Sequence, residues 1–146
     1  MFVVRPVKDK SAQKELCRLI GAEFKSEAMA YFAAELCENK ADIAYYIGIC
    51  QFKINEIGTI VSLTAADGCQ NDEAIIVMCR AVMNLMYRSG CQTAVLPSTA
   101  GDAALLASVG MPKAENKDGY EIDLKAFYEA PCKYSKEKAN YDKEEF

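Results

Sequence analysis

The spacing of apolar residues along the chain switches several times between the two-residue period of a strand and the 3.6-residue period of a helix. Strand patterns occupy residues 2–7, 29–37, 43–54, 57–64, 93–96 and 120–124. Helical patterns occupy residues 11–20, 72–89 and 101–109. The predicted order is therefore β-α-β-β-β-α-β-α-β, an α+β (α/β) fold around a mixed sheet.

The segment 29–37 supports two interpretations. Its Ala, Glu and Leu residues favour a helix, whereas the neighbouring Tyr31 and Phe32 favour a strand. A polar turn over residues 38–42 separates the segment from the next strand pattern. This turn shifts the prediction toward a strand.

The helix that follows Gln70 has the clearest amphipathic pattern. We expect Asn71 or Asp72 to cap it and Gly90 to end it. Its apolar stripe comprises Ile75, Met78, Cys79, Val82 and Met86. The stripe predicts that one face of this helix packs on the sheet.

The start of the same helix is a candidate anion site. A strand that leads through a short loop into a helix favours negative charge, because free amides and the helix dipole both point at the ligand. Here, however, Asp72 and Glu73 occupy the first turn. Two interpretations stay open: an altered phosphate loop, or an ordinary helix start that its own carboxylates stabilise.

Composition restricts the partners and the chemistry. The chain carries a net charge of -4 and no long basic run, so we expect no nucleic-acid partner. It contains no histidine, which excludes Ser-His and Cys-His catalytic pairs within the chain and histidine-ligated zinc, and we expect no metal. Its seven cysteines have no CxxC spacing, a pattern typical of reduced thiols in a cytoplasmic protein.

We expect neither a signal peptide nor a membrane span. The first residues lack the pattern of a signal peptide, and no apolar run is long enough for a membrane span. We expect a single domain over residues 1–132. Residues 133–146 form a tail rich in Lys and Glu, a composition typical of a frayed end.

Three segments match a known family. Met78–Asn84 matches its central helix, Arg88–Cys91 matches the R-x-G step into its next strand, and Leu105–Met111 is similar to its helix-to-GF corner. On these segments the chain resembles the GNAT superfamily of acetyl-CoA-dependent N-acyltransferases over residues 2–124. The resemblance implies a mixed, mostly antiparallel central sheet flanked by helices and, by analogy with the fold, a homodimer.

The resemblance also implies a site for acetyl-CoA. The family's Q/R-x-x-G-x-G/A loop falls on residues 70–75, where Glu73 and Ile75 replace small residues and fill space near the diphosphate. A splayed strand over residues 61–65 would pair its backbone with the pantetheine arm. The implied cofactor-binding residues are Ser62, Leu63, Thr64, Gln70, Asn71, Ala74 and Ile75.

The catalytic groups are less clearly marked. Many family members have a tyrosine, acting as general acid, where this chain has Leu106. Glu35 and Glu56 are the candidate general bases, and solvated surface carboxylates are the alternative interpretation. The predicted function is slow acyl transfer from acyl-CoA to a small-molecule or peptide amine. The alternative is a non-catalytic GNAT-like module for binding or dimerisation.

Overall fold

The computed structural model describes residues 1–129 and contains one six-stranded sheet in which the strands lie in sequence order. Every neighbouring pair is antiparallel except β4 and β5, which are parallel. The strands are β1 (Phe2–Pro6), β2 (Met29–Leu36), β3 (Ile43–Ile54), β4 (Gly58–Ala65), β5 (Thr93–Leu96) and β6 (Tyr120–Asp123). The predicted α+β order and the mixed, mostly antiparallel sheet are confirmed, and the segment at 29–37 is a strand.

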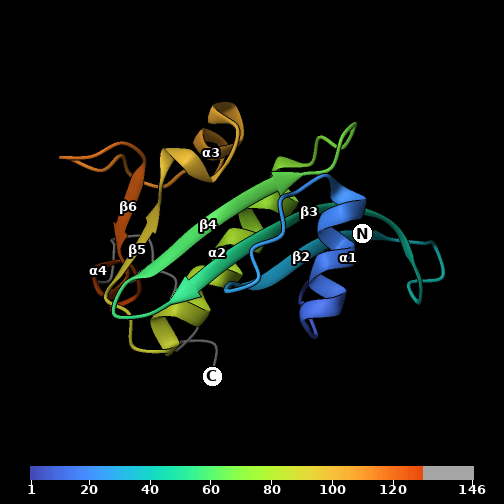
Figure 1. Ribbon diagram of the computed structural model, residues 1–146, viewed down its shortest axis with the longest axis horizontal. Helices are drawn as coiled ribbons and strands as arrows, with labels where there is room; N and C mark the ends of the chain where they lie inside the picture. Colours follow the sequence, from blue (N-terminus) through green and yellow to red (C-terminus); the bar gives the residue numbers. More distant parts are fainter. Residues whose placement is uncertain (130–146) are drawn as a thin grey trace, which may run out of the picture.

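Two helices cover opposite faces of the sheet. In Figure 1, α1 (Lys10–Ile20) lies in front of the strands and α2 (Asp72–Arg88) lies behind them. Three short helices follow β5 and β6: η1 (Ser98–Ala100), α3 (Ala103–Ser108) and α4 (Leu124–Glu129). No helix within residues 1–129 is long and apolar enough to cross a membrane.

The start of α1 differs from the sequence prediction. The helix was expected to begin at Ser11, but Asp9 caps it by accepting a hydrogen bond from the amide of Ala12 at 2.8 Å. An aspartate one residue before the first turn accepts from the third helical amide, so the chain turns helical at Lys10. The predicted end is confirmed, since Gly21 has a φ of 91°.

The prediction for α2 is confirmed in detail. Asn71 caps the helix and accepts from the amide of Ala74 at 3.1 Å, and Gly90 follows its end with a φ of 99°. The whole predicted stripe is buried: Ile75, Met78, Cys79, Val82 and Met86. On the outer side of α2, Tyr87 stacks on Tyr128 of α4 with ring centroids 4.8 Å apart, so α4 covers part of this side.

The α1 face is held to the sheet by a buried polar pair. Gln13 of α1 and Gln51 of β3 are almost fully buried, and the Gln13 amide donates to Gln51 Oε1 at 2.9 Å. Gln51 also accepts from the amide of Lys25 at 2.8 Å and donates to the carbonyl of Glu23 at 2.9 Å. One strand side chain therefore fixes both the helix and the loop that follows it.

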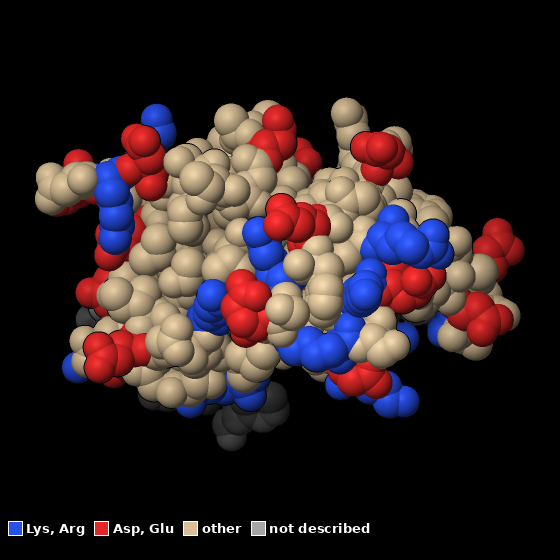
Figure 2. All heavy atoms as spheres, viewed as in Figure 1, with Lys and Arg blue, Asp and Glu red and all other residues tan. Residues whose placement is uncertain are grey.

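Charges of both signs are interspersed on the α1 side of the molecule. Figure 2 shows acidic and basic side chains mixed over α1 and its neighbouring loops, and a largely uncharged area over β4 and β5. The predicted domain end at residue 132 and the tail at residues 133–146 lie outside the described residues.

A cleft where strands β4 and β5 separate

The two parallel strands of the sheet stay together over a very short distance. β4 and β5 pair only at Gly58 with Ala94 and at Thr59 with Val95. Beyond this point the register of β4 against β3 skips Val61, which forms a β-bulge. A bulge bends its strand and increases its twist, so β4 turns away from β5 and opens a wedge.

The wedge contains a cleft of about 690 Å³. Four parts of the chain form it: the second half of β4, the loop before α2, the first turn of α2, and the segment from Gly101 through α3. The lining residues are Leu63, Thr64, Ala65, Cys69, Gln70, Asn71, Asp72, Ile75, Gly101, Asp102, Ala104, Leu105 and Ser108. The space between the separated strands is open, and its volume falls in the usual range for small-molecule sites.

The inner end of the cleft is closed by backbone. A Cβ placed on Gly101 would lie 2.4 Å from the carbonyl oxygen of Leu63, so only a glycine allows this approach. The N–H and C=O of one strand residue point to the same edge. Leu63 therefore directs its amide as well as its carbonyl toward the cleft, away from β3.

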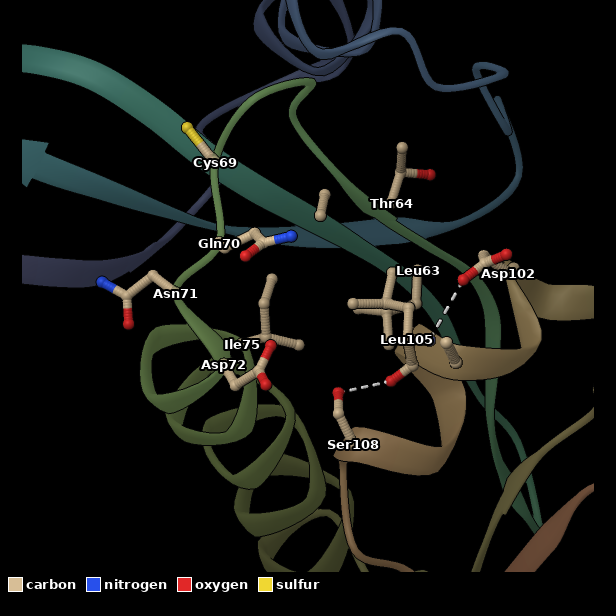
Figure 3. A pocket seen from close by; sticks show the side chains of 13 residues that line it. Leu63, Thr64, Cys69, Gln70, Asn71, Asp72, Ile75, Asp102, Leu105 and Ser108 are labelled. Atoms are coloured by element: carbon tan, nitrogen blue, oxygen red, sulfur yellow. Dashed lines mark hydrogen bonds between the residues drawn. The ribbon is translucent and has the colours of Figure 1, made fainter.

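The start of α2 forms the opposite wall. The Asn71 side chain turns back onto its own helix, where it holds the amide of Ala74, and the Asn71 carbonyl accepts from the amide of Ile75 at 3.2 Å. Gln70 extends its amide group over the mouth of the cleft (Figure 3). Two of the backbone amides in the expected phosphate loop are thus already bonded within the chain.

The two large residues of that loop have different positions. Ile75 is 1% exposed and lies on the floor of the cleft, where its Cδ1 would be 2.8 Å from a Cβ on Gly48 of β3. Glu73 is exposed and does not line the cleft. Asp72, which precedes it, does line the cleft, and in Figure 3 its carboxylate faces α3.

Within the described residues, Asp72 and Asp102 are the charged side chains of the lining, and no lysine or arginine contributes to it. Asp102 caps α3 by accepting from the amide of Leu105 at 3.3 Å. The Ser108 hydroxyl donates to the carbonyl of Leu105 at 2.6 Å. The lining of the cleft is therefore mixed in polarity and carries negative charge on two of its walls.

The structure buries Leu106 instead of presenting it to the cleft. Its side chain is 1% exposed and belongs to the main core. The side of α3 that faces the cleft carries Asp102, Leu105 and Ser108, which sequence reasoning missed. Their three-residue spacing places them on one helix face, a signal that the sequence does contain.

Some of the cofactor-binding residues expected from the sequence line the cleft, and the others are buried behind its walls. Leu63, Thr64, Gln70, Asn71 and Ile75 line the cleft. The other two, Ser62 and Ala74, are buried and do not line it. Sequence reasoning therefore located the β4 and α2 walls of the cleft but not the α3 wall.

The two candidate bases lie outside the cleft. Glu35 of β2 pairs in register with Tyr45 of β3, which lines a smaller pocket at the loop before α2. The Glu35 Oε1 atom is 2.5 Å from the N-terminal ammonium of Met1. Glu56 is exposed in the turn between β3 and β4, at the opposite end of β4 from the cleft.

The cysteines fall into two groups. Cys69 lines the cleft and is half-buried, and its thiol points away from the cleft in Figure 3 and donates to the carbonyl of Tyr46 at 3.6 Å. Cys50 is fully buried between β3 and α2, where the hydrogen bond to Cys79 and burial raise its thiol pKa well above the ordinary value. No group of three or more potential metal ligands occurs within residues 1–129.

Comparison with known proteins identifies the fold. No protein-family model matches the chain, and no curated protein matches it in sequence. An acetyltransferase of the GNAT family from Staphylococcus aureus Mu50 matches with a TM-score of 0.58 at 12% identity, over 86% of this chain and 100% of the other. The ribosomal-protein-S18-alanine N-acetyltransferase from Escherichia coli matches with a TM-score of 0.56 at 11% identity, over 83% and 88%.

A third match is a chain of the NatC complex, solved with Gag peptide and CoA. Its TM-score is 0.57 at 14% identity, over 78% of this chain and 86% of the other. Identities in this range support an assignment of fold and not of activity. The strand order, the separation of β4 from β5 and these matches agree, and the chain has the GNAT fold.

Proposed function

We propose that the cleft binds the pantetheine arm of an acyl-CoA and that the protein transfers the acyl group to an amine. The separation of β4 from β5 after Thr59 carries this proposal, because it exposes a strand edge beside the start of α2. The similar chain of the NatC complex was solved with CoA and a peptide. An extended ligand with amide groups binds to such an edge as an additional strand would.

Leu63 is the residue of β4 best placed for this contact. Its amide points into the cleft, and Thr64 and Leu105 flank it in the lining. A backbone amide in this position donates to a carbonyl of the arm or to the oxyanion that forms on the thioester. The other two expected residues, Ser62 of β4 and Ala74 of α2, are buried behind these two walls.

In the proposed reaction the amine nitrogen attacks the thioester carbonyl carbon. The new C–N bond forms, the C–S bond breaks, and the sulfur leaves as a thiolate. The proton lost by the amine goes to a base, and the thiolate takes a proton from solvent, since Leu106 is buried and has none to give. Without a positioned acid we expect slow turnover.

Glu35 is the base that this arrangement favours over Glu56. Glu35 lies directly opposite Tyr45, and cross-strand partners share a face of the sheet. That face leads to the pocket beside the loop before α2. A water molecule held there is the alternative base, and the acceptor is a small-molecule or peptide amine.

The proposal is tested by calorimetric titration of the full chain with acetyl-CoA, followed by a thiol-release assay with small amines and peptide N-termini. Ligand at 100 times Kd stabilises a binding protein by about 2.7 kcal/mol, which a thermal-shift assay also detects. Binding with slow, amine-dependent thiol release supports the proposal. No binding at millimolar acetyl-CoA contradicts it.

A second candidate is a non-catalytic module for binding or dimerisation. The Asp72 carboxylate in the cleft and the burial of Leu106 favour it, since neither helps an anionic cofactor or a leaving thiolate. In this case the loop over residues 70–75 is a degenerate remnant. Thiol release distinguishes the enzyme from the module, because a non-catalytic module releases no thiol. Light scattering tests the predicted homodimer.

A further inference from the structure

The lining of the cleft changes in character from its inner to its outer end. We propose that the acyl donor is recognised through its pantetheine arm and not through its diphosphate, so that acyl thioesters without a diphosphate bind at least as tightly as acyl-CoA. This inference rests on the proposed function and specifies the donor that the same cleft prefers.

The inner part of the cleft suits an uncharged, extended arm. Leu63, Ile75 and Leu105 give it apolar walls, and the β4 edge supplies hydrogen-bonding groups. The arm of an acyl-pantetheine alternates amides with short methylene segments. Its amides form hydrogen bonds with the backbone at the strand edge, and its methylene groups bury apolar surface. Nothing in this part of the lining requires a charged ligand.

The outer part is poorly suited to a diphosphate. Asn71 already holds the amides of Ala74 and Ile75, through its side chain and its carbonyl respectively. In Figure 3 the Gln70 amide group extends over this wall while the Asn71 side chain turns away from the cleft, and within the described residues no lysine or arginine lines it. A diphosphate would therefore lack two of the loop's backbone amides and would meet no lysine or arginine among the described lining residues.

The charged side chains of the described cleft lining are already negative. Asp72 lines the cleft in the first turn of α2, and Asp102 lies on the facing wall at the start of α3. Carboxylates in a first helical turn interact favourably with the helix dipole. Asp72 thus takes the place that an anionic ligand occupies at other helix starts, and a diphosphate would add like charge next to it.

The experiment compares three unreactive donor analogues: the S-acetonyl derivatives of CoA, of 4′-phosphopantetheine and of pantetheine. A methylene group between sulfur and carbonyl prevents transfer, so calorimetry on the full chain measures binding alone. We expect the pantetheine derivative to bind at least as tightly as the CoA derivative. We also expect added salt to tighten the binding of the CoA derivative, because salt screens the repulsion between its diphosphate and Asp72. The affinity for the pantetheine derivative should stay unchanged.

The variant Asp72→Asn tests the cause. Asn71 remains the cap, so the helix start is preserved, and we expect about tenfold tighter binding of the CoA derivative with less than a twofold change for the pantetheine derivative. The control is Asp67→Asn, which removes the same charge from an exposed residue that does not line the cleft. It should change neither affinity.

The outcomes separate the two proposals. If the CoA derivative binds tenfold more tightly than the pantetheine derivative, or if Asp72→Asn improves both equally, the inference about the donor is wrong while the proposed function stands. If none of the three analogues binds, the proposed function itself fails.

Discussion

The backbone of Gly101 packs against the carbonyl oxygen of Leu63 so closely that a Cβ on the glycine would lie 2.4 Å from that oxygen. This contact closes the inner end of the cleft between β4 and α3. It joins a strand in the middle of the sheet to the segment that follows β5. The shape of the cleft therefore depends on a residue that has no side chain.

Gly101→Ala is expected to destabilise the protein by about 1–3 kcal/mol, because the methyl group would meet backbone that has little room to move. Urea unfolding measures the change. Ser98→Ala, at an exposed residue of the neighbouring η1, is the control and should leave the midpoint within experimental error. A Gly101→Ala midpoint equal to that of the parent would show that the segment shifts freely and does not define the cleft.

A second prediction concerns the buried pair Gln13 and Gln51. Replacing Gln51 with Leu removes the partner of the Lys25 amide and of the Glu23 carbonyl, and leaves the Gln13 amide with its bond to the Lys25 carbonyl. Each unsatisfied buried group costs about 1–3 kcal/mol, so we expect a loss of at least about 2 kcal/mol in urea unfolding. Additive effects of Gln13→Leu and Gln51→Leu in the double variant would argue against a coupled pair.

The order of strands and helices was predictable because each long element carries its own period. β3 and α2 have apolar patterns long enough to identify their type, and Asn71 and Gly90 mark the ends of α2. The start of α1 was wrong by one residue because Asp9 and Ser11 are both good caps. The hydrogen bond from Asp9 to the Ala12 amide decides between them.

The cleft was only half predictable, for a physical reason. Its β4 and α2 walls follow from a family motif, whereas α3 is six residues of mostly small side chains with little amphipathic pattern. Which side of α3 faces β4 is set by the contact between Gly101 and Leu63, residues 38 positions apart in the sequence (101 − 63). Local spacing carries no information about such a contact.

The third prediction uses the cysteines as probes. Within residues 1–129, Cys37 and Cys69 are partly exposed, and Cys17, Cys50 and Cys91 are buried with raised thiol pKa values. Since the thiolate is the reactive form, iodoacetamide should modify the first two well before the other three. Peptide mass spectrometry at successive times measures the order.

The same labelling reports on the cleft. Because Cys69 lines the cleft and Cys37 does not, S-acetonyl-pantetheine should slow alkylation of Cys69 several-fold and leave Cys37 unchanged. Equal protection of both cysteines would indicate a global effect of the ligand. No protection of either would place the ligand elsewhere.

The fourth prediction is a loss of stability in alkaline solution. The pKa of Cys50 is raised in the folded protein by its hydrogen bond to Cys79 and by burial. In the unfolded chain the thiol loses its proton near pH 8.5. Above that pH the unfolded state binds fewer protons than the folded state, so the free energy of unfolding falls, by up to about 1.4 kcal/mol per pH unit for this group.

Urea midpoints between pH 6.5 and 10 test this prediction. Cys50→Val removes one titrating group and should make the decline above pH 8.5 less steep, whatever its effect on the midpoint at neutral pH, while Cys17 and Cys91 still contribute to the decline. Below about pH 7 the thiol is protonated in both states, and this group should contribute almost no slope. An identical alkaline decline in the parent and in Cys50→Val would assign the loss to other groups.

The fifth prediction compares the same substitution, alanine to tryptophan, at two positions of α3. Ala104 and Ala107 are both exposed alanines of this helix, but only Ala104 lines the cleft. Tryptophan at Ala104 should fill the space between α3 and β4 and weaken binding of S-acetonyl-pantetheine by at least tenfold. Tryptophan at Ala107 adds the same side chain outside the cleft, so its binding should stay within twofold of the parent. Calorimetry gives both affinities, and circular dichroism verifies that both variants are folded. If Ala107→Trp weakens binding as much as Ala104→Trp, the ligand does not occupy this cleft, because only the first of these two alanines, Ala104, lines it.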